Sequence, residues 1–178
     1  MQIEKPIASG RNIGTRPELV SCRGDRAFIR PTRAHLTAAD MPARTEEEQL
    51  ELDSALSQAA HTGNEAEVQR LLDAGANADY RQEDIFGFTT LIRAAKENHC
   101  GVMRLLVDRG GAAVSGRCAS GWTPAHWSAS YNKLEALELL VQLGADVSKR
   151  TPEGWSCADV AKQKNHERVV EFLANVKQ

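Results

Sequence analysis

The chain has 178 residues, enough for one ordinary domain and a tail, and 42% of them are hydrophobic and 26% charged, as in soluble globular proteins. No run of about 18 apolar residues is present, so we expect no transmembrane helix. The N-terminal residues lack the apolar core of a secretory signal. We therefore expect a cytoplasmic location, with the nucleus as the alternative, no membrane contact, and cysteines that stay reduced.

The net charge of −2 is distributed unevenly along the chain. Residues 1–44 contain eight Lys/Arg, four Asp/Glu and four of the six prolines, with no sustained helical period. This predicts a basic arm that is extended or disordered and that can contact the rest of the chain, an acidic partner or nucleic acid. Residues 45–178 contain fourteen Lys/Arg and twenty Asp/Glu, so the arm precedes an acidic body.

Order is predicted to begin at Thr45. The sequence from Thr45 to Glu48 matches a capping box, in which the hydroxyl and the glutamate each accept a backbone N–H of the first turn. A helix is predicted from here to about residue 61, ended by Gly63. A second helix is predicted over 65–74, with Gly75 as a left-handed C-cap.

The same pattern recurs at steps of 33 or 34 residues. The first three units carry a pair of small residues, altered to Ala161-Lys162 in the fourth. Further along, every unit carries a pair of large apolar residues: Leu71-Leu72, Leu105-Leu106, Leu139-Leu140 and Phe172-Leu173. Further helices are predicted at about 89–98, 102–109, 123–131, 134–143, 156–164 and 166–175. A period of this length is typical of a stacked solenoid, in which each unit buries its apolar face against its neighbours.

The third unit carries a motif in its most complete form. Gly121-Trp122-Thr123-Pro124-Ala125-His126 is followed by Gly144-Ala145-Asp146-Val147 at the end of the same unit. Here the chain resembles the ankyrin repeat family. The resemblance implies an all-α solenoid of helix-turn-helix units joined by β-hairpin-like fingers. We assign repeats to about 45–83, 84–117, 118–150 and 151–178, which together form the ankyrin repeat domain at 45–178.

The sequence offers no catalytic or metal-binding pattern. None of the five histidines has metal-ligand spacing, and the four cysteines show no CxxC motif. Dinucleotide, phosphate-loop and nucleophile-elbow motifs are missing as well. We therefore expect no enzyme activity, no cofactor and no metal. The resemblance implies that His126 forms a structural hydrogen bond at the turn into its helix.

Three aromatic residues share one repeat position. The resemblance implies that the residue after each turn glycine points from the finger into the concave face, and in this chain these residues are Phe88, Trp122 and Trp155. We expect a row with a spacing of roughly 10 Å, about one helix-packing distance. Exposed aromatic residues often anchor a partner, so the row is the predicted contact surface. The alternative is that the rings pack against one another or against the arm.

Other residues are expected around this row. Tyr131 and Lys96 are predicted to line the helix side of the groove, and Trp127 is predicted to belong to the core. The first finger, from Gly75 to residue 84, has about two residues more than the finger after Gly144. Its Tyr80 and Phe86 are candidate contacts if the finger is shaped for a partner; otherwise the length is tolerated loop variation.

The remaining candidate is the basic edge of the fingers, where Arg117 lies with Arg81, Lys149 and Arg150, although a solvated charged face explains the same pattern. The favoured function is a non-catalytic protein-interaction module, an adaptor, scaffold or inhibitor that binds a protein partner as a monomer through its concave face and fingers. The alternative is a nucleic-acid-associated regulator that contacts phosphates through the basic arm. Nucleic acid is the less favoured partner, because the body is acidic and the arm has few aromatic residues.

Overall fold

The computed structural model describes residues 44–82 and 86–176. The arm predicted for residues 1–44 therefore lies outside the described residues, apart from Arg44, and so does the middle of the first finger. The described part contains eight α-helices and no strand, which confirms the predicted all-α class. The helices are α1 (Glu46–Thr62), α2 (Glu65–Asp73), α3 (Thr90–Glu97), α4 (Cys100–Asp108), α5 (Pro124–Ser130), α6 (Leu134–Gln142), α7 (Cys157–Gln163) and α8 (Glu167–Asn175).

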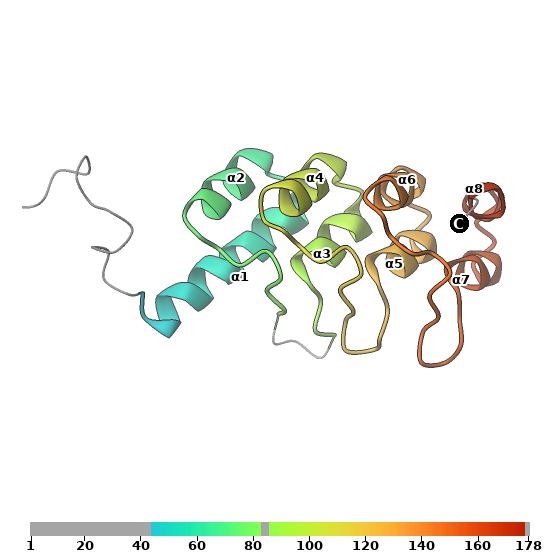
Figure 1. Cartoon of the computed structure of the whole chain (residues 1–178), viewed down its shortest axis with the longest axis horizontal. Helices are drawn as coiled ribbons and strands as arrows, with labels where there is room; N and C mark the ends of the chain where they lie inside the picture. Colours follow the sequence, from blue (N-terminus) through green and yellow to red (C-terminus); the bar gives the residue numbers. More distant parts are fainter. Residues whose placement is uncertain (1–43, 83–85, 177–178) are drawn as a thin grey trace, which may run out of the picture. The chain divides into compact units, whose positions relative to one another are not determined.

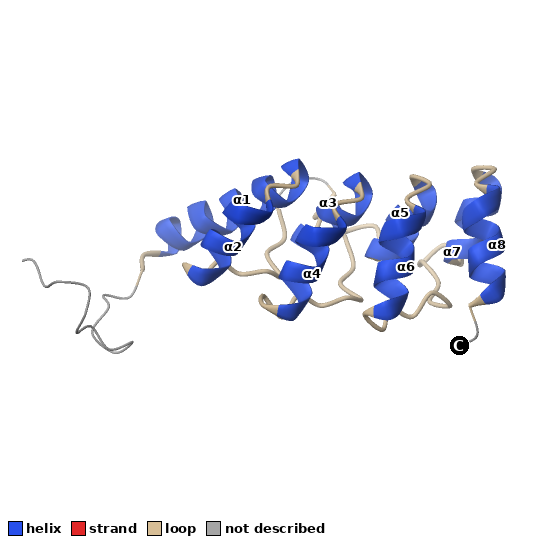
Figure 2. Cartoon of the chain, turned by 90° about the horizontal axis from the view of Figure 1, so that it is seen from above, coloured by secondary structure: helices blue, strands red, loops and turns tan. Residues whose placement is uncertain are grey.

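The helices form pairs that stack side by side. Helices α1, α3, α5 and α7 lie in one row and α2, α4, α6 and α8 in a second, and the loops between pairs extend beyond the first row (Figures 1 and 2). Each helix of the first row packs on the next, and α2 packs on α4. This is the predicted solenoid, because each pair finds its apolar partners only in neighbouring pairs.

The predicted helix boundaries hold to within one or two residues, and the caps explain them. The capping box is confirmed: Thr45 Oγ1 accepts the N–H of Glu48 at 3.2 Å, and the Glu48 carboxylate accepts the N–H of Thr45 at 3.1 Å. Gly63 ends α1 in the left-handed region, with φ 75°. Thr89, Thr123 and Ser156 have extended backbones and act as N-caps, so their helices begin one residue later than predicted.

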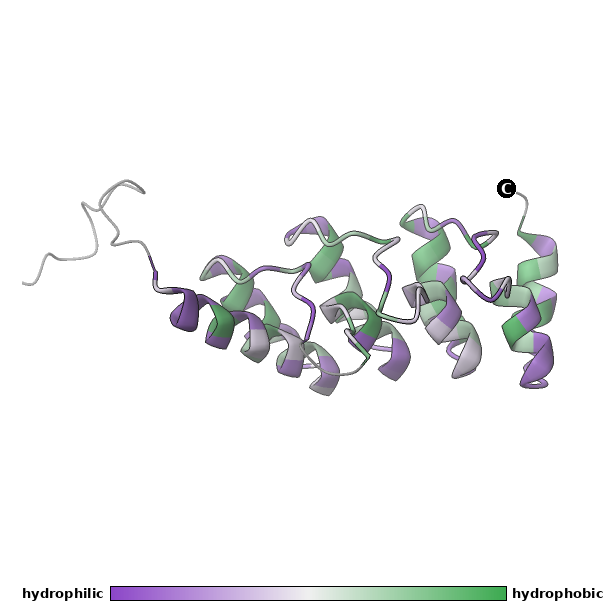
Figure 3. Cartoon of the chain, turned by 90° about the horizontal axis from the view of Figure 1, so that it is seen from below, coloured by the Kyte–Doolittle hydropathy of each residue, from purple (hydrophilic) through white to green (hydrophobic). Residues whose placement is uncertain are grey.

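The buried core runs through the stack along the recurring apolar residues. Leu71, Leu106 and Leu140 are buried, as are Ala94 and Ala129 of the small pairs. The last pair, Phe172-Leu173, is only half-buried. Figure 3 shows broad hydrophobic stretches on α4 and α6, whereas the start of α1 is hydrophilic.

The fingers are hairpin-like turns rather than paired strands. In the second finger, between α4 and α5, the Cys118 N–H donates to the Trp122 carbonyl oxygen at 2.9 Å, and the Gly121 N–H donates back to Cys118 at 2.9 Å. Gly121 has φ 76°, and a Cβ there would come within 2.6 Å of Pro152 in the third finger. Glycine is therefore required for both the turn and the approach of the next finger.

Candidate functional site

The most distinctive surface of the molecule is a group of five aromatic side chains from two successive units. We call Phe86, Phe88, Trp122, Trp127 and Tyr131 the aromatic cluster. Ring centroids lie 5.2 Å apart for Phe86 and Phe88, 5.0 Å for Phe88 and Trp127, 5.1 Å for Trp122 and Trp127, and 6.0 Å for Trp127 and Tyr131. These separations are those of interacting aromatic pairs.

Backbone hydrogen bonds fix the finger residues of the aromatic cluster. The carbonyl oxygen of Phe88 accepts the Gln82 N–H at 3.1 Å. The carbonyl oxygen of Phe86 accepts the N–H of Ala119 at 2.9 Å, which ties the first finger to the second. Trp127 and Tyr131 are four residues apart on α5 and its C-cap, so they lie on one face of the helix. The first finger therefore positions Phe86 and Phe88, and α5 positions Trp127 and Tyr131.

Trp127 is the centre of the cluster, and its predicted place in the core is wrong. It is half-buried, and its ring contacts Phe88, Trp122 and Tyr131. Its Nε1–H is buried and has no hydrogen-bond acceptor among the described residues. The sequence already indicated that Trp127 lies outside the core, because Gln58 and Arg93 occupy the same repeat position in the two preceding units. A position that takes polar residues in two of the three sister units is a weaker candidate for the core, although α7 has the buried Val160 there.

The two ends of the aromatic cluster are open to solvent. Phe86 is 46% exposed and Tyr131 is 45% exposed, whereas Phe88 and Trp122 are half-buried. The ammonium group of Lys96 lies 5.1 Å from the centre of the Tyr131 ring, within the range of a cation–π interaction. The structure therefore brings together Phe86, Phe88, Trp122, Tyr131 and Lys96 of the predicted site residues.

The other predicted site residues lie apart from the aromatic cluster. Trp155 is 40% exposed and makes no ring contact among the described residues, so the rings converge on Trp127 instead of forming a row of three. Tyr80 lines a cavity of about 590 Å³ beside α1, with Leu50, Glu51, Ser54, Ala55 and Gln58. Arg117 is exposed at the edge of the second finger, where its Nη1 donates to the Gly121 carbonyl oxygen at 3.3 Å.

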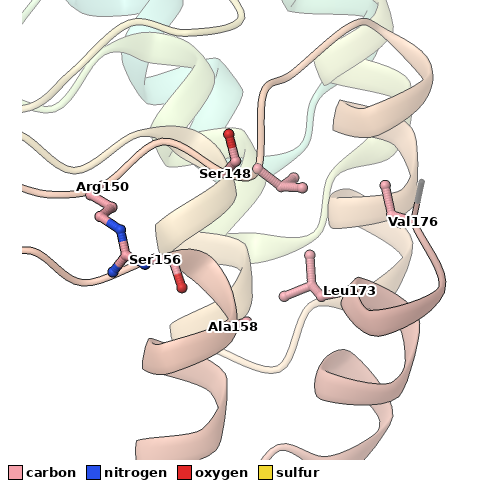
Figure 4. Close-up of a pocket in the computed structure, with 7 residues that line it drawn as sticks. Ser148, Arg150, Ser156, Ala158, Leu173 and Val176 are labelled. Atoms are coloured by element: carbon pink, nitrogen blue, oxygen red, sulfur yellow. The ribbon is translucent and has the colours of Figure 1, made fainter. Parts of the chain in front are cut away.

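A second hollow lies at the end of the stack formed by α7 and α8. It has a volume of about 360 Å³ and is lined by Val147, Ser148, Arg150, Ser156, Ala158, Leu173 and Val176. Figure 4 shows Leu173 and Val176 on one side and Arg150 beside Ser156 on the other. Two of the polar groups serve the local fold, because Ser156 caps α7 and Arg150 donates to the Gly154 carbonyl oxygen at 2.7 Å. This hollow carries no reactive arrangement.

His126 and Cys157 have side chains of types that can act in catalysis, but both are buried and serve the fold. Burial lowers the pKa of His126, whose Nδ1 lies 2.8 Å from Thr123 Oγ1, as the predicted structural hydrogen bond requires. Burial raises the pKa of the Cys157 thiol to about 12, so this cysteine is a poor nucleophile. Within residues 44–82 and 86–176, no group of three His, Cys, Asp or Glu side chains is placed to hold a metal ion. Every helix of the same residues is too short or too polar to cross a membrane.

Comparison with known proteins is consistent with this geometry. A family model described as "Ankyrin repeats (3 copies)" matches residues 35–117, 56–151 and 112–178. The chain is 32% identical to tyrosine-protein kinase HTK16 of Hydra vulgaris over 68% of its length, and 29% identical to ankyrin repeat and KH domain-containing protein mask-1 of Caenorhabditis elegans over 61%. It is 28% identical to human SH3 and multiple ankyrin repeat domains protein 2 over 67%.

These relatives are much longer proteins. The chain spans 16% of the length of the kinase, 4% of mask-1 and 6% of the human protein. The similarity therefore concerns a segment of each relative, and their activities are not carried over to this chain.

Proposed function

The chain belongs to the ankyrin repeat family, and we propose that it is a non-catalytic protein-interaction module whose contact surface is the aromatic cluster. Ankyrin repeats are stacked solenoids whose extended surfaces serve protein binding. In this chain the module would act as an adaptor, scaffold or inhibitor, according to what else the partner binds.

The observation that carries the proposal is the concentration of aromatic side chains at one exposed place. Only 5% of the residues are aromatic, nine in all, and five of these nine belong to the aromatic cluster. Tryptophan and tyrosine are enriched among the residues that dominate binding energies at protein interfaces. A large apolar surface that remains exposed on a folded domain indicates an interaction site.

The packing of the aromatic cluster also suits binding. Its rings pack on one another, and main-chain hydrogen bonds and α5 hold the backbone that carries them, so less conformational entropy is lost when a partner docks. Phe86 and Tyr131 can each bury further apolar area on a partner, since about half of each side chain is exposed.

Comparative affinity capture tests the proposal. The full chain, a Phe86→Ala/Tyr131→Ala variant and a Trp155→Ala variant are immobilised, and proteins bound from an extract are quantified by mass spectrometry. Trp155→Ala is the matched control, because Trp155 is exposed to a similar degree but lies outside the aromatic cluster. We expect a set of proteins that binds the full chain and the control equally and is lost from the double variant. Identical binding to all three would refute a site at the aromatic cluster.

A further inference from the structure

The charges around the aromatic cluster define the chemistry of its partner. We propose that the aromatic cluster binds an acidic segment of a protein, in which apolar side chains lie between carboxylates that pair with Arg117 and Lys96. This inference rests on the proposed function and adds the chemical class of the partner.

Cationic side chains lie at both ends of the line of rings formed by Trp122, Trp127 and Tyr131. Arg117 is bonded to the carbonyl oxygen of Gly121, the residue before Trp122, and its side chain is exposed. At the other end, Lys96 lies over the ring of Tyr131. Because Trp127 contacts both Trp122 and Tyr131, the surface runs from a guanidinium group across three aromatic rings to an ammonium group.

The length of this surface sets the spacing of the expected carboxylates. The ring centroids are 5.1 Å apart for Trp122 and Trp127 and 6.0 Å apart for Trp127 and Tyr131. An extended chain rises about 3.3 Å per residue, so roughly three or four residues cover the rings. An extended partner segment therefore needs a short apolar stretch flanked by an acidic residue on each side.

Among the described residues, two further cationic side chains occupy the cluster's repeat positions in neighbouring units. Lys164 is exposed at the C-cap of α7, the position that Tyr131 occupies in α5, and Arg93 is half-buried on α3 at the repeat position of Trp127. Within residues 44–82 and 86–176, the carboxylate beside Lys96 is Glu97, whose Oε1 lies 3.7 Å from Lys96 Nζ and 3.8 Å from His61 Nδ1. Glu97 therefore offsets part of the charge of Lys96, whereas no ion pair among the described residues involves Arg117.

The acidity of the domain is concentrated in its first unit. Residues 45–82 contain two Lys/Arg and nine Asp/Glu, a net charge of −7, whereas residues 83–178 contain twelve and eleven, a net charge of +1. The first unit therefore repels a long polyanion that extends along the stack, such as single-stranded nucleic acid. A short acidic peptide that covers only the aromatic cluster avoids this repulsion, so we favour a peptide over nucleic acid.

Selection from a random peptide library tests the inference with a defined probe. Phage-displayed peptides of roughly 12 residues, long enough to cross the aromatic cluster, are selected on the immobilised full chain. Enriched peptides are then synthesised with a fluorescein label, and their Kd values are measured by fluorescence anisotropy. We expect Asp and Glu to exceed Lys and Arg in the enriched peptides, with aromatic or aliphatic residues between the acids. An enriched set without an acidic excess overturns the inference.

Charge variants locate the acidic contact. Arg117→Glu should raise the Kd of the enriched peptides by about fivefold or more, since an attraction becomes a repulsion. The matched control is Arg150→Glu, because Arg150 has the same position in the third finger but lies beside Trp155 and 3.4 Å from the Asp159 carboxylate. It should change the Kd by less than about twofold. Lys96→Gln is the second test variant and should also raise the Kd. Arg117 donates a hydrogen bond within its finger, so its replacement could disturb the finger, whereas Lys96 lies on α3 and its replacement leaves the finger bonds unchanged.

The outcomes separate this inference from the proposed function. Peptides that lose binding to the Phe86→Ala/Tyr131→Ala variant but not to Arg117→Glu or Lys96→Gln would overturn the acidic partner and leave a protein-binding cluster. Peptides that are insensitive to all these variants, or a selection without any enrichment, would contradict both. A labelled single-stranded oligonucleotide of about 12 nucleotides that bound the aromatic cluster more tightly than every enriched peptide would overturn the inference in favour of nucleic acid.

Discussion

His126 joins the third unit to the fourth, because its Nε2 lies 3.2 Å from the carbonyl oxygen of Trp155, 29 residues further along the chain. A carbonyl oxygen can only accept, so the proton of the neutral ring lies on Nε2. Nδ1 then accepts from the N–H of Thr123 at 3.4 Å and faces the Thr123 hydroxyl. The buried imidazole thus caps its own helix and also holds the base of the next finger.

This arrangement predicts a loss of stability as the pH falls. Burial lowers the pKa of His126 in the folded chain, with the charge of Arg117 as a smaller contribution in the same direction. The unfolded chain therefore binds a proton at higher pH than the folded chain does. Stability is fully present above the ordinary histidine pKa of about 6.5 and decreases as the pH falls through and below it.

Urea unfolding of the full chain and a His126→Gln variant, at pH 7.5 and pH 5.5, measures this effect. We expect the full chain to lose more unfolding free energy between the two pH values than the variant, which lacks the titrating group. Equal losses in both proteins would show that His126 does not control the acid sensitivity.

Leu106 provides the test of the core register. It is buried on α4, in an interior unit with neighbours on both sides, so Leu106→Ala should reduce the unfolding free energy by roughly 2–5 kcal/mol. Leu105, the half-buried member of the same pair, is the matched control, and its truncation should cost less. Urea unfolding measures both changes. A cost below about 1 kcal/mol for Leu106→Ala would contradict the packing described here.

Asp53 on α1 is a buried carboxylate, and its contribution to stability can be compared with that of an exposed ion pair. Its Oδ1 accepts the Asn77 N–H at 2.7 Å and the Gln49 side-chain N–H at 2.8 Å, which fixes the start of the first finger. Asp53→Ala removes both hydrogen bonds to this buried carboxylate and should cost about 1–3 kcal/mol. The control is Asp73→Ala, which removes an exposed contact to Arg109 and should cost at most about 1 kcal/mol. Equal costs in chemical denaturation would contradict the structural role of Asp53.

The repeat period predicted the fold well because it is a local pattern that recurs along the chain. Each unit repeats its own caps and core, so Thr123 and Leu106 could be placed from the sequence. The misplaced bounds are N-cap residues counted as helical, most helix ends set one residue too late, and α4, which begins at Cys100 instead of about residue 102. Helical type, order and approximate bounds follow from such signals.

The aromatic cluster was only partly predictable, because its contacts depend on a large side chain that reaches across units. The positions of Phe88 and Trp122 followed from the repeat, but their convergence depends on the size and rotamer of Trp127. The aromatic cluster stops before Trp155 because α7 has the small, buried Val160 where α5 has Trp127. Spacing along the chain alone does not show which rings meet.

Trp122→Ala should affect binding far more than folding. The turn around Trp122 depends on Gly121, Thr123 and the main-chain bonds of the finger, so the variant should stay folded, as urea unfolding and circular dichroism can verify. Trp127→Ala should lose more stability, because its ring contacts three neighbours in the aromatic cluster.

The most direct measurement is the affinity of a protein recovered by comparative capture, determined by titration calorimetry for the full chain, Trp122→Ala and Trp155→Ala. We expect Trp122→Ala to weaken binding by about 2 kcal/mol or more, about thirtyfold in Kd, as the loss of a central aromatic anchor does. Trp155→Ala should change the affinity little. An unchanged affinity for a folded Trp122→Ala variant, or an equal loss for Trp155→Ala, would contradict a contact surface centred on the aromatic cluster.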